Sequence, residues 1–253
     1  MKSAGIDIGS RTIKLVIVEN GKVTLTRKRE NSFEPLKICS DLLKGLNYDK
    51  ITATVYGRNL FRKNFDCEII SETKACSVGT KDIFPLCQTI LDIGGQDTKA
   101  ISLDENGKIL KFEMNDRCAA GTGRFLEIMA MALGCSVPDF GTEALSAKKA
   151  EKINSMCTVF AESEVISTLS KGASRNEIAL GIHQSIVKRS IVQLKKVGIK
   201  NNFTFVGGVA LNPCIQKLLE CYTGKTVIIP PDPQIVTAFG CALYGYAKLQ
   251  GNT

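Results

Sequence analysis

Two cysteines each lie a few residues before a stretch that is typical of a helix. Cys118 lies in NDRCAAGTGRFLE (115–127), ahead of two glycines and an apolar run, and Cys157 lies in SMCTVFAESEVI (155–166). The first N–H groups of a helix lack partners within it and carry partial positive charge. Such surroundings favour a thiolate and a bound anionic group, for example an iron–sulfur cluster. Two of the ten cysteines could also fall at helix starts by chance, so a structural role stays open.

The cysteines as a whole indicate a reducing compartment. They form neither a CxxC pair nor a ferredoxin-type run. The N-terminus MKSAGIDIGS lacks the apolar stretch of a signal peptide, and no apolar run approaches the ~20 residues of a membrane span. We therefore expect a cytoplasmic protein without membrane attachment, in which disulfides are absent and most cysteines are small buried hydrophobic residues.

The composition is that of a globular protein with a basic surface. The chain has 253 residues, 44% of them hydrophobic, which is enough for one large domain or two smaller ones. Its net charge is +8, but basic residues are dense only at TRKRE (26–30) and VKRS (187–190). Without a recognition motif or a basic stripe, nucleic acid is not an expected partner. An acidic protein partner would suit this surface.

A segment near the N-terminus recurs 85 residues later in the chain. IDIGSRTIKLVIVE (6–19) matches LDIGGQDTKAISLD (91–104), and an ENGK turn follows each copy. The shift superimposes Asp7, Ile8, Gly9 and Lys14 on Asp92, Ile93, Gly94 and Lys99. Each copy predicts a strand, a glycine turn, a second strand, a turn and a third strand. A repeat of this length indicates two related lobes.

The glycine turns of the repeat have the residue types of a phosphate site. An aspartate at the end of a buried strand is costly unless it is paired or bound to a metal. The glycine that follows lets the backbone approach a ligand closely. Two ordinary hairpins are the alternative, but two copies in register favour phosphate binding. We expect Asp7 and Asp92 to hold Mg²⁺ through water.

A third glycine element lies near the C-terminus. In FVGGVALN (205–212) an apolar strand ends at Gly207–Gly208, and a short helix is expected after Pro213. This arrangement suits the nucleoside end of a ligand, although a plain strand-to-helix turn would look the same. The segment 230–249 then predicts a proline-rich loop and a helix of small residues that can pack closely.

Helical patterns fill the second half of the chain. They predict helices over 122–133, over 158–171 with Thr158 as N-cap, and over 174–197, which opens with a Ser174–Glu177 capping pair. His183 lies in the last of them. We interpret it as a structural or surface residue, because no Cys, Asp or Glu follows at i+4 to share a metal.

These elements resemble a known superfamily of ATPases. Residues 5–14, 92–99 and 205–212 are similar to the phosphate-1, phosphate-2 and adenosine motifs of sugar kinases, actin and heat-shock chaperones. The resemblance implies an α/β fold of two ribonuclease H-like lobes with mixed sheets flanked by helices, and ATP in the cleft between them. It implies a first lobe over 1–88, joined by a C-terminal helix within 233–253. The second lobe, 89–232, would carry the two cysteines and the adenosine motif.

The longer motifs resemble one family within this superfamily. GIDIGSRTIK, YGRN, DIGGQDTK, NDRCAAGTGRFLE, CTVFAESEVISTLSKG and GGVALN are similar to the archerase-type, ATP-dependent activators of 2-hydroxyacyl-CoA dehydratases and to the ATP-binding subunits of benzoyl-CoA reductases. This implies an ATPase that drives an electron from ferredoxin or flavodoxin into a partner, an iron–sulfur dehydratase or a CoA-ester or double-cubane reductase.

The resemblance also implies a homodimer that shares one [4Fe-4S] cluster, with Cys118 and Cys157 as its ligands. Stoichiometry agrees, because a cubane takes four thiolates and a twofold dimer presents each pair twice. ATP and Mg²⁺ would be the other cofactors. Gln96, Asp7 or Asp92 would position the attacking water. The implied ATP contacts are Gly9, Ser10, Arg11, Thr12, Lys14, Gly94, Gly95, Gln96, Asp97, Gly121, Gly123, Gly207, Gly208 and Gln234.

One departure and two alternatives remain at the level of sequence. Family members often carry Cys-His where this chain has Ala75-Cys76, so we assign Cys76 no role. A small-molecule kinase acting on a sugar or a carboxylate would explain the ATP motifs but not the two cysteine motifs. A regulator that binds a cluster and senses ATP without catalysis would explain both sets of motifs.

Overall fold

The computed structural model describes residues 1–116, 118–154 and 157–251, and the chain divides into two compact units. The first unit comprises Met1–Cys87, Leu103–Ile109 and Pro230–Thr253, and the second comprises Gln88–Ser102 and Leu110–Ile229. Within the described residues, no helix has the length and apolar character needed to cross a membrane.

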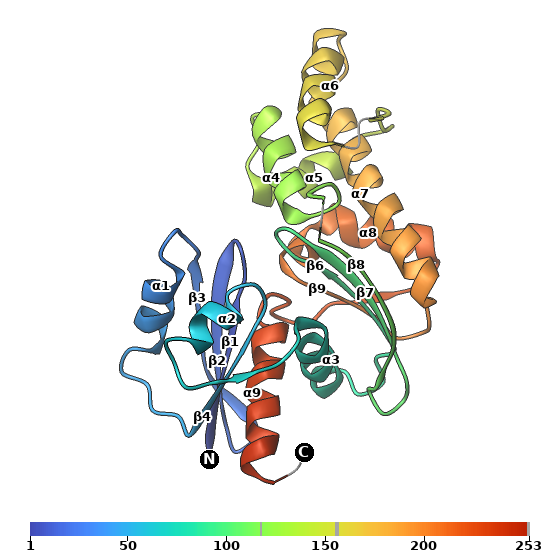
Figure 1. Cartoon of the computed structure of the whole chain (residues 1–253). Helices are drawn as coiled ribbons and strands as arrows, with labels where there is room; N and C mark the ends of the chain where they lie inside the picture. Colours follow the sequence, from blue (N-terminus) through green and yellow to red (C-terminus); the bar gives the residue numbers. More distant parts are fainter. Residues whose placement is uncertain (117, 155–156, 252–253) are drawn as a thin grey trace. The chain divides into compact units, whose positions relative to one another are not determined.

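The first unit contains a five-stranded mixed sheet (Figure 1). Its order is β3-β2-β1-β4-β5, with β1 antiparallel to β2 and parallel to β4. The strands are β1 (Lys2–Ile8), β2 (Thr12–Glu19), β3 (Lys22–Glu30), β4 (Lys50–Thr54) and β5 (Glu68–Ile69). Residues 3–8 of β1 are all buried, as expected for a central strand covered on both faces.

The helices of the first unit pack on this sheet and on each other. They are α1 (Pro35–Leu43), α2 (Arg58–Arg62), α3 (Glu72–Ile83) and α9 (Val236–Leu249). A Cβ atom added to Gly5 of β1 would lie 2.0 Å from the Ala238 carbonyl oxygen of α9. One added to Gly240 would lie 1.8 Å from the Ala75 carbonyl oxygen of α3. The predicted close packing of the small-residue helix is therefore confirmed.

The second unit repeats the topology of the first. Its sheet has the order β10-β9-β6-β7-β8, with β6 antiparallel to β7 and parallel to β9. The strands are β6 (Thr89–Ile93), β7 (Thr98–Leu103), β8 (Ile109–Asn115), β9 (Phe203–Val206) and β10 (Val227–Ile228). Counted from its own first strand, each sheet reads 3-2-1-4-5. The predicted pair of ribonuclease H-like sheets is confirmed.

The helices of the second unit form one hydrophobic core with its sheet. They are α4 (Gly123–Ala132), α5 (Val137–Leu145), α6 (Thr158–Ser170), α7 (Arg175–Val197), a 3-10 turn (Gly208–Leu211) and α8 (Pro213–Thr223). Ser174 caps α7 by accepting from the Glu177 N–H, as predicted. The prediction of Thr158 as an N-cap was wrong. Cys157 has the extended backbone of the N-cap, and Thr158 is already helical.

Candidate functional site

The first glycine turn joins two strands whose ends carry an ion pair. Asp7 and Lys14 are direct cross-strand neighbours, and Lys14 Nζ lies 3.0 Å from Asp7 Oδ2. Asp7 is 5% exposed, and its Oδ1 has no hydrogen-bond partner among the described residues. A buried carboxylate oxygen without a partner is costly, and a hydrated cation would satisfy it. The site therefore fits Mg²⁺, the ion expected from the sequence.

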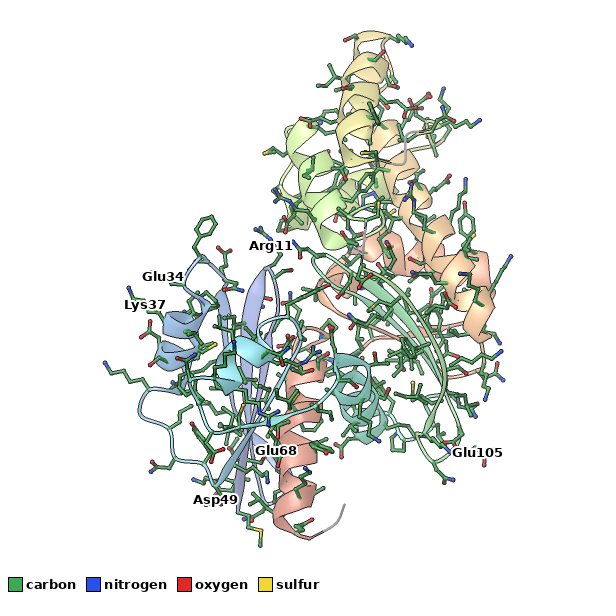
Figure 2. All side chains as sticks on the ribbon, viewed as in Figure 1. Arg11, Glu34, Lys37, Asp49, Glu68 and Glu105 are labelled. Carbon is green, nitrogen blue, oxygen red and sulfur yellow. The ribbon has the colours of Figure 1, made fainter. Side chains whose placement is uncertain are left out.

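The backbone between Asp7 and Lys14 is held from the end of β3. Asn31 Nδ2 donates to the Gly9 carbonyl at 2.7 Å, and the Asn31 N–H donates to the Arg11 carbonyl at 2.9 Å. Ser10 and Thr12 are half-buried, while Arg11 is exposed at the tip of the turn (Figure 2). The two carbonyls thus accept hydrogen bonds from Asn31, and the remaining groups of the turn can face a ligand.

The second glycine turn has the same register and one more carboxylate. Asp92 pairs with Lys99 across the strands, as Asp7 does with Lys14. Lys99 is only 1% exposed, and its Nζ lies 2.8 Å from Asp97 Oδ1 and 3.8 Å from Asp92 Oδ2. The Gly94 N–H donates to the Asp97 carbonyl at 2.9 Å and closes the turn, which leaves Gln96 exposed. The sequence reading gave Lys99 no role, although the repeat aligns it with Lys14.

The segment that follows Cys118 is attached to this second turn. The Gly123 N–H donates to the Gly94 carbonyl at 2.9 Å, and the Arg124 N–H donates to the Gly95 carbonyl at 2.8 Å. These are the first two N–H groups of α4, so they are not free for an anion beside Cys118. The expectation of free helix N–H groups next to this cysteine was wrong. The Gly121 carbonyl also accepts from Thr98 Oγ1, at 3.0 Å.

Both predicted ligand cysteines are exposed. Asn115 Nδ2 donates to the Cys118 carbonyl at 3.0 Å, which holds the loop after β8. Cys157 is the N-cap of α6 and makes no side-chain capping bond. The described residues contain no group of three or more His, Cys, Asp or Glu side chains that could hold a metal ion. Two accessible thiols fit the soft donor set of an iron–sulfur cluster, with the other ligands drawn from a second chain.

The remaining cysteines divide by exposure. Cys221 is exposed near the end of α8, and Cys67 and Cys135 are intermediate. The others are buried: Cys39, Cys76, Cys87, Cys214 and Cys241. Burial raises the pKa of Cys39 and of Cys214 to about 12, which makes both poor thiolate ligands. Cys76, to which the sequence reading gave no role, lies inside the first unit.

The adenosine motif meets the end of β6 at Gly207. This residue has φ +88°, and a Cβ atom added there would lie 2.5 Å from Asp92 Oδ1 and 2.4 Å from the Ile93 carbonyl oxygen. Gly208 follows and is exposed. Only glycine fits at position 207, because a side chain would displace the Asp92 carboxylate. The structure thus brings the adenosine motif and the second phosphate turn together in the second unit.

A buried histidine supports the end of the same motif. His183 Nδ1 donates to the Ala179 carbonyl at 2.7 Å, and Nε2 lies 3.0 Å from Asn212 Nδ2, from which it accepts. Asn212 Oδ1 in turn accepts from the Cys214 and Ile215 N–H groups and caps α8. Burial lowers the pKa of His183 to about 4, so the ring is neutral. The structural role expected for His183 is confirmed.

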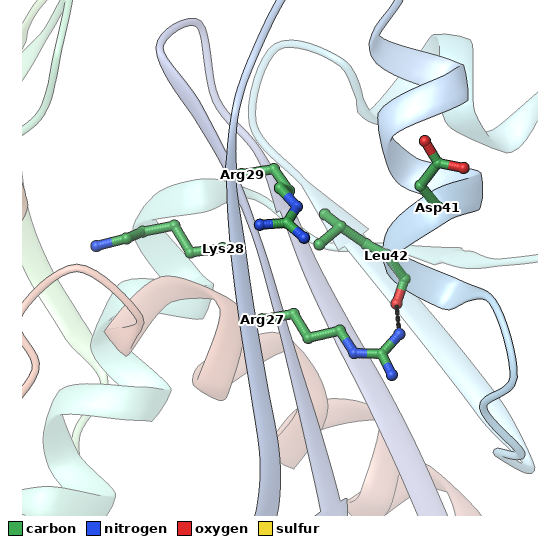
Figure 3. Close-up of a pocket in the computed structure, with 5 residues that line it drawn as sticks. All are labelled: Arg27, Lys28, Arg29, Asp41 and Leu42. Atoms are coloured by element: carbon green, nitrogen blue, oxygen red, sulfur yellow. Dashed lines mark hydrogen bonds between the residues drawn. The ribbon is translucent and has the colours of Figure 1, made fainter.

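Gln234 lies in the first unit, where Lys28 Nζ donates to its Oε1. Lys28 also borders a pocket of about 450 Å³ between β3 and α1 (Figure 3). Another pocket residue, Arg27, donates to the Leu42 carbonyl at 2.7 Å and holds the end of α1. None of the residues predicted to bind ATP or metal lines this pocket.

Comparison with known proteins agrees with this geometry. The family model described as the BadF/BadG/BcrA/BcrD ATPase family matches residues 4–245. The chain belongs to this family. It is 40% identical over 253 residues to the (R)-2-hydroxyglutaryl-CoA dehydratase activating ATPase of Acidaminococcus fermentans, with 96% of each chain covered. The predicted ATPase and the family resemblance are confirmed.

Solved structures confirm the fold of this family member. The activator of the 2-hydroxyisocaproyl-CoA dehydratase from Clostridium difficile, solved with bound ADPNP, has a TM-score of 0.91 at 38% identity, with 99% of this chain and 96% of that chain covered. A ROK family glucokinase from Streptomyces griseus has a TM-score of 0.62 at 10% identity, over 97% and 90% of the two chains. The second likeness shows the sugar-kinase-like fold alone.

Gly207→Ala should destabilise the protein and weaken nucleotide binding. The backbone at Gly207 has φ +88° and ψ 176°, a conformation that costs a non-glycine residue about 1–3 kcal/mol, and the new methyl group would also strike Asp92. Gly224→Ala is a matched control, because Gly224 has φ +65° with no atom within 4 Å of an added Cβ. Thermal unfolding should show the larger loss for Gly207→Ala. Equal losses would mean that the contact with Asp92 contributes nothing.

His183 should make stability depend on pH. Because its pKa falls from 6.5 to about 4 on folding, the unfolded chain binds more protons between these values. The stabilisation is complete above pH 6.5 and is lost as pH falls toward 4, by about 2 kcal/mol between pH 7.5 and pH 5. The stability gap between wild type and His183→Gln should narrow by that amount, measured by denaturant unfolding. A gap that stays constant with pH would contradict this assignment.

Proposed function

We propose that this ATPase is an activator that uses ATP to deliver a low-potential electron to an iron–sulfur partner. The partner is a 2-hydroxyacyl-CoA dehydratase or a related CoA-ester or double-cubane reductase, and the electron comes from ferredoxin or flavodoxin. The working unit is a homodimer in which Cys118 and Cys157 of both copies hold one [4Fe-4S] cluster. Two of the relatives are named as activators of such dehydratases, which supports this class of partner.

One observation carries the proposal, namely the attachment of the Cys118 loop to a phosphate turn. The carbonyls of Gly94 and Gly95 accept from the first two N–H groups of α4. A phosphate bound at this turn needs its free N–H groups and moves its backbone as it binds. Any such movement pulls on α4 and on the loop before it. A kinase would need no thiol at the far end of that loop.

Within this proposal each conserved type of group in the turns has a task. Lys14 and the backbone of Gly9–Thr12 contact phosphates in the first unit, and the backbone of 94–97 does so in the second. Asp7 and Asp92 hold Mg²⁺ through water, which the unpartnered Asp7 Oδ1 supports. Gln96 is exposed beside the second turn and can orient the attacking water. The nucleoside lies against Gly207 and Gly208, with Gln234 as a further contact.

The two cysteines complete the proposal. When bound, the cluster supplies one-electron redox chemistry. Cys157 presents its thiol at the positive end of the α6 dipole, which favours the thiolate. Cys118 presents its thiol from the loop that ends at Gly121 and Gly123. Nucleotide can bias the two states of such a dimer only by its differential affinity for them, so the hydrogen bonds to Gly94 and Gly95 must differ between states.

Cys118→Ala and Cys157→Ala should each abolish the cluster in protein purified without oxygen. Wild type should contain about four irons per dimer, because one cubane takes four thiolates. Cys221→Ala is the control, since Cys221 is also exposed but lies near the end of α8. Iron analysis and visible absorption provide the measurement. Full iron content in both single variants would rule out this ligand set.

Gly121→Ala and Gly123→Ala should uncouple ATP hydrolysis from electron transfer while the iron stays bound. Gly121 has φ +89°, and a Cβ atom at Gly123 would lie 3.0 Å from the Gly94 carbonyl oxygen. Both changes distort the link, so electrons delivered per ATP should fall by about tenfold, which corresponds to about 1.4 kcal/mol of lost coupling. Gly134→Ala is the control, because it places an alanine at φ +64° in open space beyond the other end of α4.

The ratio of electrons to ATP is the quantity to measure, with a dye acceptor in place of the partner. If the ratio in Gly121→Ala and Gly123→Ala equals that of Gly134→Ala, the link does not couple the two events. Loss of iron from the first two variants would mean that the loop only supports Cys118.

A further inference from the structure

Arg189 of α7 lies against the loop between Cys118 and α4. A Cβ atom added to Gly121 would lie 3.4 Å from Arg189 Cδ and 3.8 Å from its Cβ. The aliphatic part of the arginine therefore packs directly on Gly121. Neither the family motifs nor the sequence reading gave Arg189 a role. It occupies the basic segment VKRS, which the sequence reading treated as surface.

The charge of Arg189 is directed toward Cys118. The side chain is half-buried, and among the described residues its guanidinium makes no hydrogen bond and no ion pair with a carboxylate. Burial lowers the pKa of Arg189, and the negative charge of the Cys118 thiolate acts against this shift. An arginine remains protonated at neutral pH, and a buried cation is costly without a counter-charge. The counter-charge that the described chain offers is the Cys118 thiolate.

We propose that Arg189 is the counter-charge of the anionic group held by Cys118 and sets the redox potential of that group. The inference rests on the proposed function and adds a positioning residue to it. A cluster becomes more negative on reduction, so a nearby guanidinium stabilises the reduced form and raises the potential. Potentials of such clusters respond to net charge and to hydrogen bonds at the sulfurs.

The contact with Gly121 gives this tuning a dependence on nucleotide. Gly121 is tied to the second phosphate turn through Thr98, and Gly123 is tied to it through Gly94. Arg189 belongs to α7, a helix of 23 residues that is held elsewhere by His183 and Asn212. Movement of the loop against α7 changes the distance from the guanidinium to the Cys118 sulfur. In a partly desolvated setting the Coulomb energy depends strongly on that distance.

The test is a redox titration of the dimer purified without oxygen, in which dithionite supplies the electron and electron paramagnetic resonance reports the reduced cluster. Arg189→Met and Arg189→Gln remove the charge, and Met keeps an apolar chain against Gly121. Lys188→Gln is the matched control, because it removes one positive charge from the exposed neighbouring position. Each variant is measured with ADP and with a non-hydrolysable ATP analogue.

Both neutral Arg189 variants should keep their iron and have a lower potential than wild type. A tenfold change in the electron-transfer equilibrium corresponds to about 59 mV for one electron, and we expect at least that shift. Lys188→Gln should match wild type. The difference between the two nucleotide states should also shrink in the Arg189 variants.

Three results would overturn the inference. One is an unchanged potential in an Arg189 variant that retains its iron, and another is an equal shift in Lys188→Gln. The third is loss of iron from both Arg189 variants, which would make Arg189 a residue needed for assembly. A wild-type dimer without iron would instead refute the proposed function itself, so the two failures are distinguishable.

Discussion

The hydrogen bonds between the first two N–H groups of α4 and the carbonyls of Gly94 and Gly95 constrain the whole second unit. A helix begins where its first N–H groups find partners, and here the partners are the backbone of a phosphate turn. The position of α4 is therefore fixed by that turn, and the loop from Cys118 to Thr122 must follow. Asp97 and Lys99 stabilise the turn from inside, where Lys99 is almost fully buried. The site for phosphate and the site for the thiol thus share one backbone.

Helix α7 supplies a second physical connection within the same unit. His183 holds Asn212 at the end of the adenosine motif, while Arg189 packs on Gly121 six residues further along. Six residues of α-helix span about 9 Å, so one rigid element contacts both the nucleoside motif and the cysteine loop. The neutral state of His183 is essential to this arrangement, because a protonated ring could not accept from Asn212. Both arms of the mechanism therefore depend on residues that make no contact with ATP themselves.

The sequence predicted the fold through the repeat and left the cross-element contacts unpredicted. The alignment of Asp7 with Asp92 and of Lys14 with Lys99 already contained the strand register that the structure displays. Cys157 was placed one residue outside its true capping position, because threonine is the commoner N-cap. The partners of Lys99, Arg189 and Asn212 lie far from them in the chain or depend on side-chain direction. Periodicity and spacing report neither of these properties.

Comparing the two units shows where the second function was added. Between its third and fourth strands the first unit has only residues 31–49, which include α1, whereas the second unit has residues 116–202 with α4 to α7. Cys118 and Cys157 both lie in this longer insertion. A sugar-kinase-like fold binds nucleotide with the strands and turns that both units share. An insertion that begins beside the second phosphate turn can respond to the nucleotide while leaving the strands unchanged. The electron-transfer role is therefore best understood as a property of the insertion, with the repeated sheets supplying the ATP site that drives it.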